Sequence, residues 1–173
     1  FVLSGVVKAF VCRCAPCCVA VSLVPYVLKG TLGHVALYVA APAPWLFSGM
    51  SNELPRPFVI AHRGRVPAVD GVDQPPLRAL IVRSRLENCW IKVCGSERIS
   101  LPPYAAAVPF ARTLVTAAPA RVLWGTDFPH PNATHEADEA DLVDLVPQFS
   151  ADKVVQRQLL VDNPARLYDF DPL

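Results

Sequence analysis

Each of five short apolar segments in the chain leads into polar or charged residues, and these residues hold the groups that could do chemistry. Asp127 comes three residues after the apolar run 122–124. A carboxylate in that place can act as a general base toward water or as a metal ligand, and it can equally cap the loop that follows. His62 ends another such run, and Arg65 follows it three residues later. The other three segments bring the polar residues Arg13, Tyr38 and Arg98.

The elements that must position these groups follow from the alternation of apolar runs with stretches of helical spacing. The runs predict strands at 5–11, 34–39, 58–61, 90–93 and 122–124. Helices are expected at 16–32, 42–53, 75–86, 104–117, 136–146 and 153–167, the last with Asp152 as its N-cap. Repeated strand–helix units imply a parallel sheet covered by helices, and the carboxyl ends of such strands meet at one edge. The polar groups are therefore expected to converge.

Five strand–helix units leave two architectures open. The 173 residues suit a single domain spanning 1–173. A closed eight-stranded barrel typically takes ~250 residues, so the chain is either an open doubly wound sheet or part of a barrel. The glycine-rich loops that bind nucleotide phosphates do not occur in the sequence, which removes the main support for a nucleotide-binding sheet.

Composition and charge exclude several classes of protein. Hydrophobic residues make up 53% and charged residues 18%, which indicates a packed globular chain. A net charge of +1 argues against binding to nucleic acid or to a membrane surface through bulk charge. The first 28 residues contain interrupting prolines and charges, so they do not match a membrane helix or a signal peptide. These features favour a cytoplasmic location.

Four of the six cysteines, Cys12, Cys14, Cys17 and Cys18, crowd the start of the chain. Their spacing is unlike the paired spacing of a zinc ribbon, and no histidine lies near them. Ordinary buried or partly buried thiols in a reducing compartment are therefore favoured over a metal site.

Several motifs resemble a known family. The segment 123–132, Leu-Trp-Gly-Thr-Asp-Phe-Pro-His-Pro-Asn, resembles the last barrel strand and loop of the amidohydrolase superfamily, and 160–168 resembles its C-terminal helix. The segments 59–65 and 90–100 are similar to the 2-pyrone-4,6-dicarboxylate lactonase branch in particular, as are 34–38 and, more weakly, 5–11. The strong similarity covers about residues 33–173.

The resemblance implies a fold and a reaction. The fold would be a partial (β/α)8 TIM barrel, holding about the last five strand–helix units with the first strands missing. The reaction would be attack of water on the carbonyl of a lactone that carries two carboxylates. Asp127 would activate the water, and His62 would sit near the carbonyl oxygen. Substrate carboxylates would bind Arg13, Arg65 and Arg98, with the pocket further lined by Tyr38, His130 and Asn132.

The chain departs from the family pattern at several points. The superfamily's His-x-His pair is absent, because the four histidines are His34, His62, His130 and His135. No metal or other cofactor is therefore expected. The family's Asp before the strand-end histidine is replaced by Ala61, which removes an orienting group for His62, and a family Arg in the first strand is replaced by Val7.

Other functions stay open at this point. The chain starts at Phe1, which favours a piece of a longer protein; it could then be a non-catalytic remnant, or another hydrolase or a decarboxylase of the same superfamily. An open barrel would expose a strand edge, and a second copy of the chain could cover it. Of the remaining arginines, Arg63, Arg83 and Arg85 are predicted to be ordinary surface residues.

Overall fold

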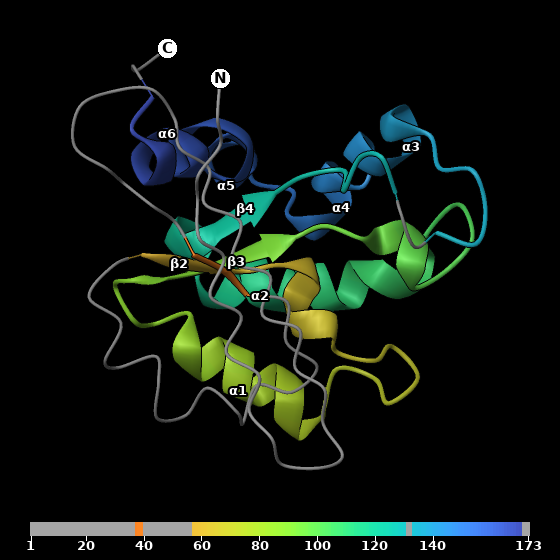
Figure 1. The fold of residues 1–173 in the computed structure, drawn as a ribbon, viewed down its shortest axis with the longest axis horizontal. Helices are drawn as coiled ribbons and strands as arrows, with labels where there is room; N and C mark the ends of the chain where they lie inside the picture. The colour runs from red at the N-terminus through yellow and green to blue at the C-terminus, as the bar shows by residue number, and fades with distance from the viewer. Residues whose placement is uncertain (1–36, 40–56, 131–132, 171–173) are drawn as a thin grey trace, which may run out of the picture.

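The structure of the chain, a computed structural model, describes residues 37–39, 57–130 and 133–170 (Figure 1). Its sheet has four strands in the order β1-β2-β3-β4, and every neighbouring pair is parallel. The strands are β1 (Leu37–Val39), β2 (Phe58–Ile60), β3 (Cys89–Val93) and β4 (Val122–Trp124). The prediction of an α/β fold with a parallel sheet is confirmed, while the strand expected at 5–11 lies outside the described residues.

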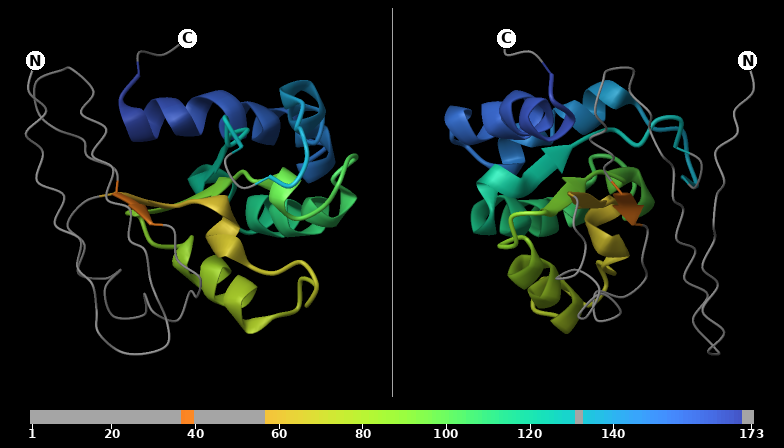
Figure 2. Two further views of the ribbon diagram at one scale, coloured as in Figure 1. Left: turned by 45° about the vertical axis from the view of Figure 1, so that its right-hand side comes forward. Right: turned by 60° about the vertical axis from the view of Figure 1, so that its left-hand side comes forward.

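Six α-helices are described, and they lie on either side of the sheet. Helices α1 and α2 lie below it in Figure 1, whereas α5 and α6 lie above it next to β4, an arrangement that both views of Figure 2 repeat. The helices are α1 (Pro75–Arg83), α2 (Val108–Ala117), α3 (Glu139–Val143), α4 (Val146–Phe149), α5 (Lys153–Arg157) and α6 (Asn163–Tyr168). Within the described ranges, no helix is long and apolar enough to cross a membrane.

Alternating side chains of the strands divide the core into two clusters. The larger cluster joins residues such as Phe58, Ile91 and Val122 to α1, α2 and α4. The helical stripe predicted from the sequence is part of it, since Val108, Ala111, Leu114 and Val115 are all buried. The smaller cluster, on the opposite strand faces, consists of Val59, Trp90, Leu123 and Leu167. Burial on both faces is typical of parallel strands.

The helix predicted at 104–117 starts later than expected, and the one at 136–146 is broken. Tyr104 adopts a left-handed conformation with φ of 58°, so α2 starts only at Val108, after a short 3-10 turn. Asp138 accepts a hydrogen bond from the amide of Ala140 and thereby caps α3, which is followed by the separate helix α4. Polar residues such as aspartate are preferred at this position because their side chains accept hydrogen bonds from the free amides of the first helical turn.

The last predicted helix is present, but it contains a wider turn. Asp152 accepts from the amide of Val154, which confirms the N-cap. A π-helical turn over Gln158–Asp162 joins α5 to α6. Asn163 then donates through Nδ2 to the carbonyls of Pro119 (2.7 Å) and Val122 (2.8 Å). This buried amide ties the last helix to the start of β4, so the Asn-Pro pattern has a structural role.

Candidate active site

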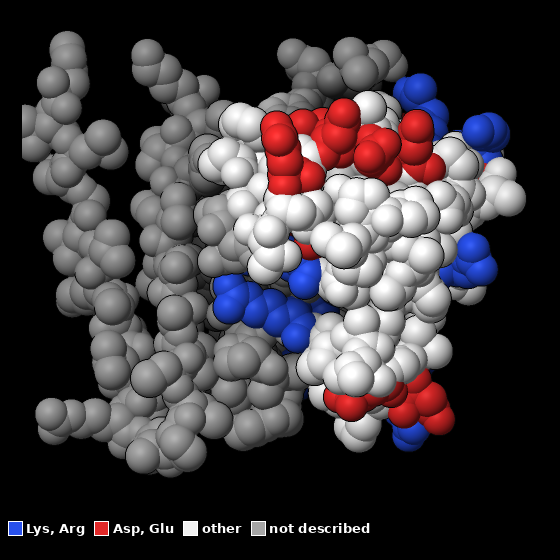
Figure 3. Space-filling view, turned by 90° about the vertical axis from the view of Figure 1, so that its right-hand side faces the viewer, with Lys and Arg blue, Asp and Glu red and all other residues white. Residues whose placement is uncertain are grey.

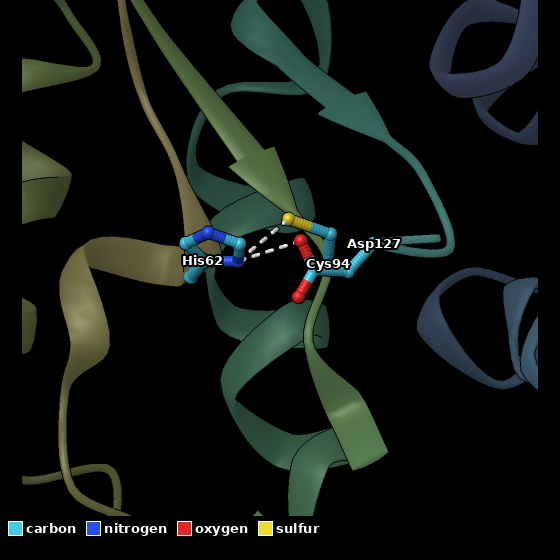
Figure 4. A group of neighbouring side chains, drawn as sticks. All are labelled: His62, Cys94 and Asp127. Atoms are coloured by element: carbon cyan, nitrogen blue, oxygen red, sulfur yellow. Dashed lines mark hydrogen bonds and ion pairs between the residues drawn. The ribbon is translucent and has the colours of Figure 1, made fainter. Parts of the chain in front are cut away.

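Three side chains from the ends of three neighbouring strands meet at one point (Figure 4). His62 follows β2, Cys94 follows β3, and Asp127 lies in the loop after β4. Nδ1 of His62 lies 3.2 Å from Sγ of Cys94 and 3.5 Å from Oδ1 of Asp127. Parallel strands bring their carboxyl ends to a common edge, and the site is built on this edge.

Asp127 is held by Arg98. The Arg98 Nε donates to Oδ2 of Asp127 at 2.7 Å, and Nη2 of the same guanidinium also contacts Oδ2. Both side chains are largely buried, with exposed fractions of 17% for Arg98 and 14% for Asp127. Since both contacts fall on Oδ2, Oδ1 of Asp127 is turned toward His62. The carboxylate is thus oriented and neutralised on one side while its other oxygen faces the histidine.

The protonation of His62 and Cys94 is set mainly by burial. Burial lowers the pKa of His62 to about 4; the charge of Asp127 opposes this shift, and Arg98, Arg65 and Lys92 add to it. The imidazole is therefore neutral at pH 7. Burial likewise raises the pKa of Cys94, whose thiol keeps its proton.

A pocket of about 560 Å³ opens beside this group. Its polar lining includes His62, Arg65 and Arg98. Its apolar lining consists of Val66, Pro67, Ala68, Val69 and Ile99. A pocket that combines apolar walls with several cationic groups suits a small anion.

The backbone is unusual at the site. His62, Arg65, Asp127 and His130 all have a positive φ, between 53° and 77°. Such conformations cost of order 1–3 kcal/mol each for residues other than glycine, and they concentrate where function requires a particular side-chain direction. Gly95 is also left-handed (φ 74°), and a Cβ there would lie 3.3 Å from both Arg98 Cδ and His62 Nδ1. The local backbone is therefore shaped to bring these side chains together.

The structure brings most of the predicted site residues to this edge. Asp127, His62 and Arg98 are in contact, and Arg65 lines the pocket next to them. His130 lies one turn beyond Asp127 and approaches the buried Glu97 at 3.6 Å. Tyr38 lies in β1, in register with Val59 of β2. Arg13 and Asn132 lie outside the described residues, as does the Cys12–Cys18 group.

One prediction from the sequence is wrong. Arg63, expected at the surface, is 3% exposed. Its guanidinium donates to the carbonyl of Gly95 (2.8 Å) and to Oγ of Ser96 (3.4 Å), so it ties the turn after β2 to the loop after β3. The left-handed backbone of the turn sends this side chain into the interior, which the residue types alone do not reveal. Arg85 is exposed, as predicted.

Two further residues of the site were not singled out from the sequence. Cys94 contacts the ring of His62 through its sulfur atom. Glu97 has a side chain with no exposed surface, next to Arg98 and His130. Both lie in the loop directly after β3, and the rule that strand ends carry site residues already pointed to that loop.

Among the described residues, one group has the donor types and spacing of a metal site. The ligand atoms of His62, Cys94 and Asp127 lie within 4.8 Å of one another. Their surroundings oppose a bound cation, because the Arg98 guanidinium already pairs with Asp127 and burial raises the pKa of the Cys94 thiol. The donor set therefore does not fit a resident ion.

Comparisons with known proteins agree on one family. The family model described as Amidohydrolase matches residues 5–170. A 4-sulfomuconolactone hydrolase of Hydrogenophaga intermedia is 40% identical over 139 residues, which cover 78% of this chain and 46% of that protein. A 2-pyrone-4,6-dicarboxylate hydrolase of Comamonas testosteroni is 40% identical over 151 residues, covering 78% and 48%.

Solved structures give the same picture. A protein of Agrobacterium tumefaciens, solved in its apo form, superimposes with a TM-score of 0.67 at 26% identity, covering 80% of this chain and 51% of that one. The chain thus spans about half the length of the curated relatives and of the solved structure that it matches.

Proposed function

Because the chain belongs to the amidohydrolase family, we propose that it hydrolyses a lactone that carries carboxylate groups, using Asp127 as the general base. The observation that carries the proposal is the contact of Asp127 with His62 and Arg98, two residues that line a pocket together with Arg65. Relatives named for lactone hydrolysis support the reaction class, and the one named for a dicarboxylate supports the substrate class.

In the proposed reaction, Asp127 removes a proton from water as the water oxygen bonds to the carbonyl carbon of the lactone. The carbonyl oxygen becomes an oxyanion. When the carbonyl re-forms, the bond to the ring oxygen breaks, and the ring oxygen takes the proton back from Asp127. The products are a carboxylic acid, which ionises in solvent, and a hydroxyl group. General base catalysis of this kind contributes about 10²–10⁴-fold to the rate.

His62 serves in this scheme as a neutral hydrogen-bond donor. The protonated thiol of Cys94 can donate to Nδ1 of His62, which leaves the ring proton on Nε2. From there the imidazole can donate to the carbonyl oxygen as negative charge develops. A positioned donor of this kind is worth ~3–4 kcal/mol in related reactions. The lowered pKa of His62 fits this role because the neutral ring is the form present at pH 7.

The arginines would select the substrate. Arg65 lines the pocket, and its guanidinium has the fork geometry that binds a carboxylate through two hydrogen bonds. Arg98 makes two contacts to Asp127, so its remaining N–H groups would be left for the substrate. Arg13, Tyr38, His130 and Asn132 complete the proposed substrate-binding set.

The wider setting is also a proposal. The four parallel strands would be consecutive strands of a (β/α)8 barrel. A second copy of the chain would cover the open edge of this barrel, and sedimentation at several protein concentrations would detect such a dimer. The reaction would need no metal, and activity that survives treatment with a chelator would support this. A cytoplasmic location is favoured by the two described cysteines, Cys89 and Cys94, which are buried free thiols.

The test is hydrolysis of 2-pyrone-4,6-dicarboxylate by the purified chain, followed by the loss of its ultraviolet absorbance. We expect Asp127→Asn to lower kcat by on the order of 10³-fold, because the amide keeps the shape and the contact with Arg98 but cannot take the proton. Turnover that survives the substitution would refute Asp127 as the base. A folded chain without turnover would instead support a non-catalytic remnant of the barrel.

A further inference from the structure

We propose that Glu97 is a positioning residue of this site, which holds Arg98 and His130 in place from the buried side. The catalytic consequence of this role rests on the proposed function, whereas the contacts of Glu97 do not depend on it. Glu97 itself would touch neither the substrate nor the reacting water.

Glu97 is a carboxylate without access to solvent. Its side chain has no exposed surface, and its two oxygens have no hydrogen-bond donor among the described residues. A buried carboxylate is costly unless cationic or polar groups surround it. Here they are Arg98, with Nε 3.7 Å from Oε1, and His130, with Nδ1 3.6 Å from the same oxygen. The carboxylate therefore lies between His130 and Arg98, of which Arg98 lines the pocket.

These contacts connect three parts of the chain. Glu97 and Arg98 belong to the turn after β3, whereas His130 belongs to the loop after β4. On its other side, Nε2 of His130 lies 3.1 Å from Oε1 of Glu139, at the start of α3. One imidazole thus bridges a fully buried carboxylate and one that is 49% exposed. The Glu97–His130–Glu139 bridge joins the loops that carry Arg98 and Asp127.

The catalytic consequence acts through Arg98. Its guanidinium lies between two carboxylates, at 3.7 Å from Glu97 and 2.7 Å from Asp127. If Glu97 loses its charge, Asp127 is the one carboxylate of the two that still attracts Arg98. The orientation that Arg98 gives to the carboxylate of Asp127 is then no longer fixed. A misplacement of about 1 Å in a catalytic group can cost on the order of 10²-fold in rate.

The experiment compares three variants in the full chain. Glu97→Gln removes the buried charge while it keeps the shape of the side chain. Glu97→Asp keeps the charge but shortens its reach. Glu136→Gln removes an equal charge from an exposed position and is the matched control. Thermal unfolding establishes that each variant is folded, and nitrogen-15 spectra of the histidine rings report on His130 directly.

We expect Glu97→Gln to shift the His130 ring resonances and to lower kcat by on the order of 10-fold, with a smaller change in KM. Glu97→Asp should fall between the wild type and Glu97→Gln, and Glu136→Gln should match the wild type. If the His130 resonances in Glu97→Gln match those in Glu136→Gln, the proposal is overturned. The spectra decide this even if the wild type does not hydrolyse the lactone, in which case only the proposed function fails. Should Glu97→Gln not fold, the His130 resonances of Glu97→Asp decide instead: a shift supports the proposal and wild-type values overturn it.

Discussion

The strongest physical prediction concerns how stability depends on pH through His62. Above pH 6.5 the imidazole is neutral in both the folded and the unfolded chain. Between pH 6.5 and about 4 the unfolded chain binds a proton at this residue, while the folded chain does not. The free energy of unfolding must therefore fall as the pH falls through this window, and the loss levels off below about pH 4.

The size of the effect follows from the shift. Lowering the pKa from 6.5 to about 4 corresponds to a ceiling of about 3 kcal/mol, at 1.36 kcal/mol for each unit. The pocket is open to solvent on the side of His62, whose side chain is 17% exposed. Screening by this solvent reduces the expected loss to on the order of 1–2 kcal/mol.

The assay is urea unfolding of the wild type and of His62→Gln at pH 7.5, 6.5, 5.5 and 4.5, followed by tryptophan fluorescence. Subtracting the two free energies of unfolding removes the contribution of the titrating groups that do not interact with His62. The free energy of unfolding of the wild type minus that of His62→Gln should fall by on the order of 1–2 kcal/mol between pH 7.5 and 4.5. A difference that stays constant, or that moves the other way, would refute a His62 held neutral by burial.

Two further substitutions separate binding from structure, with Arg85→Met at an exposed position as the control for both. Arg65→Met should raise the KM of a dicarboxylate lactone by on the order of 10-fold, and should raise that of a lactone with a single carboxylate less, as steady-state kinetics on both substrates would show. An equal change for the two lactones would contradict a carboxylate partner for Arg65. Arg63→Met should lower the free energy of unfolding by about 2 kcal/mol, because it removes two buried hydrogen bonds of about 1 kcal/mol each. Urea unfolding measures this, and a stability equal to that of Arg85→Met would show that the buried guanidinium is not needed.

The sequence predicts those residues of the site whose positions follow from the topology of the sheet. His62, Arg98 and Asp127 each follow a buried strand, and a parallel sheet brings such positions to one edge whatever the detailed packing. The features that could not be predicted depend on the local backbone conformation of single residues and on where it points their side chains. Arg63 follows His62 directly, and only the left-handed backbone of that turn sends its side chain inward. Similarly, the cap by Asp138 sets the start of α3, and α4 is a separate helix that has Pro147 in its first turn, neither of which periodicity reveals.

The charges around the pocket support a doubly charged substrate. Among the described residues, the acidic side chains Glu136, Asp138, Glu139, Asp141 and Asp144 are exposed. On the face in Figure 3, acidic side chains gather along the upper edge and in a smaller group at the lower edge, while one group of basic side chains lies near the centre and others lie toward the right-hand edge.

Around His62, positively charged side chains outnumber negatively charged ones. Four cationic side chains, Arg63, Arg65, Lys92 and Arg98, lie close enough to act on one another or on the imidazole, and two carboxylates, Glu97 and Asp127, oppose them. With a neutral imidazole, this leaves an excess of two positive charges, which a dicarboxylate would neutralise. Glu97 thus does more than fix Arg98: its buried charge offsets the repulsion between Arg63 and Arg98, and without it Asp127 would be the one carboxylate of this group left to do so.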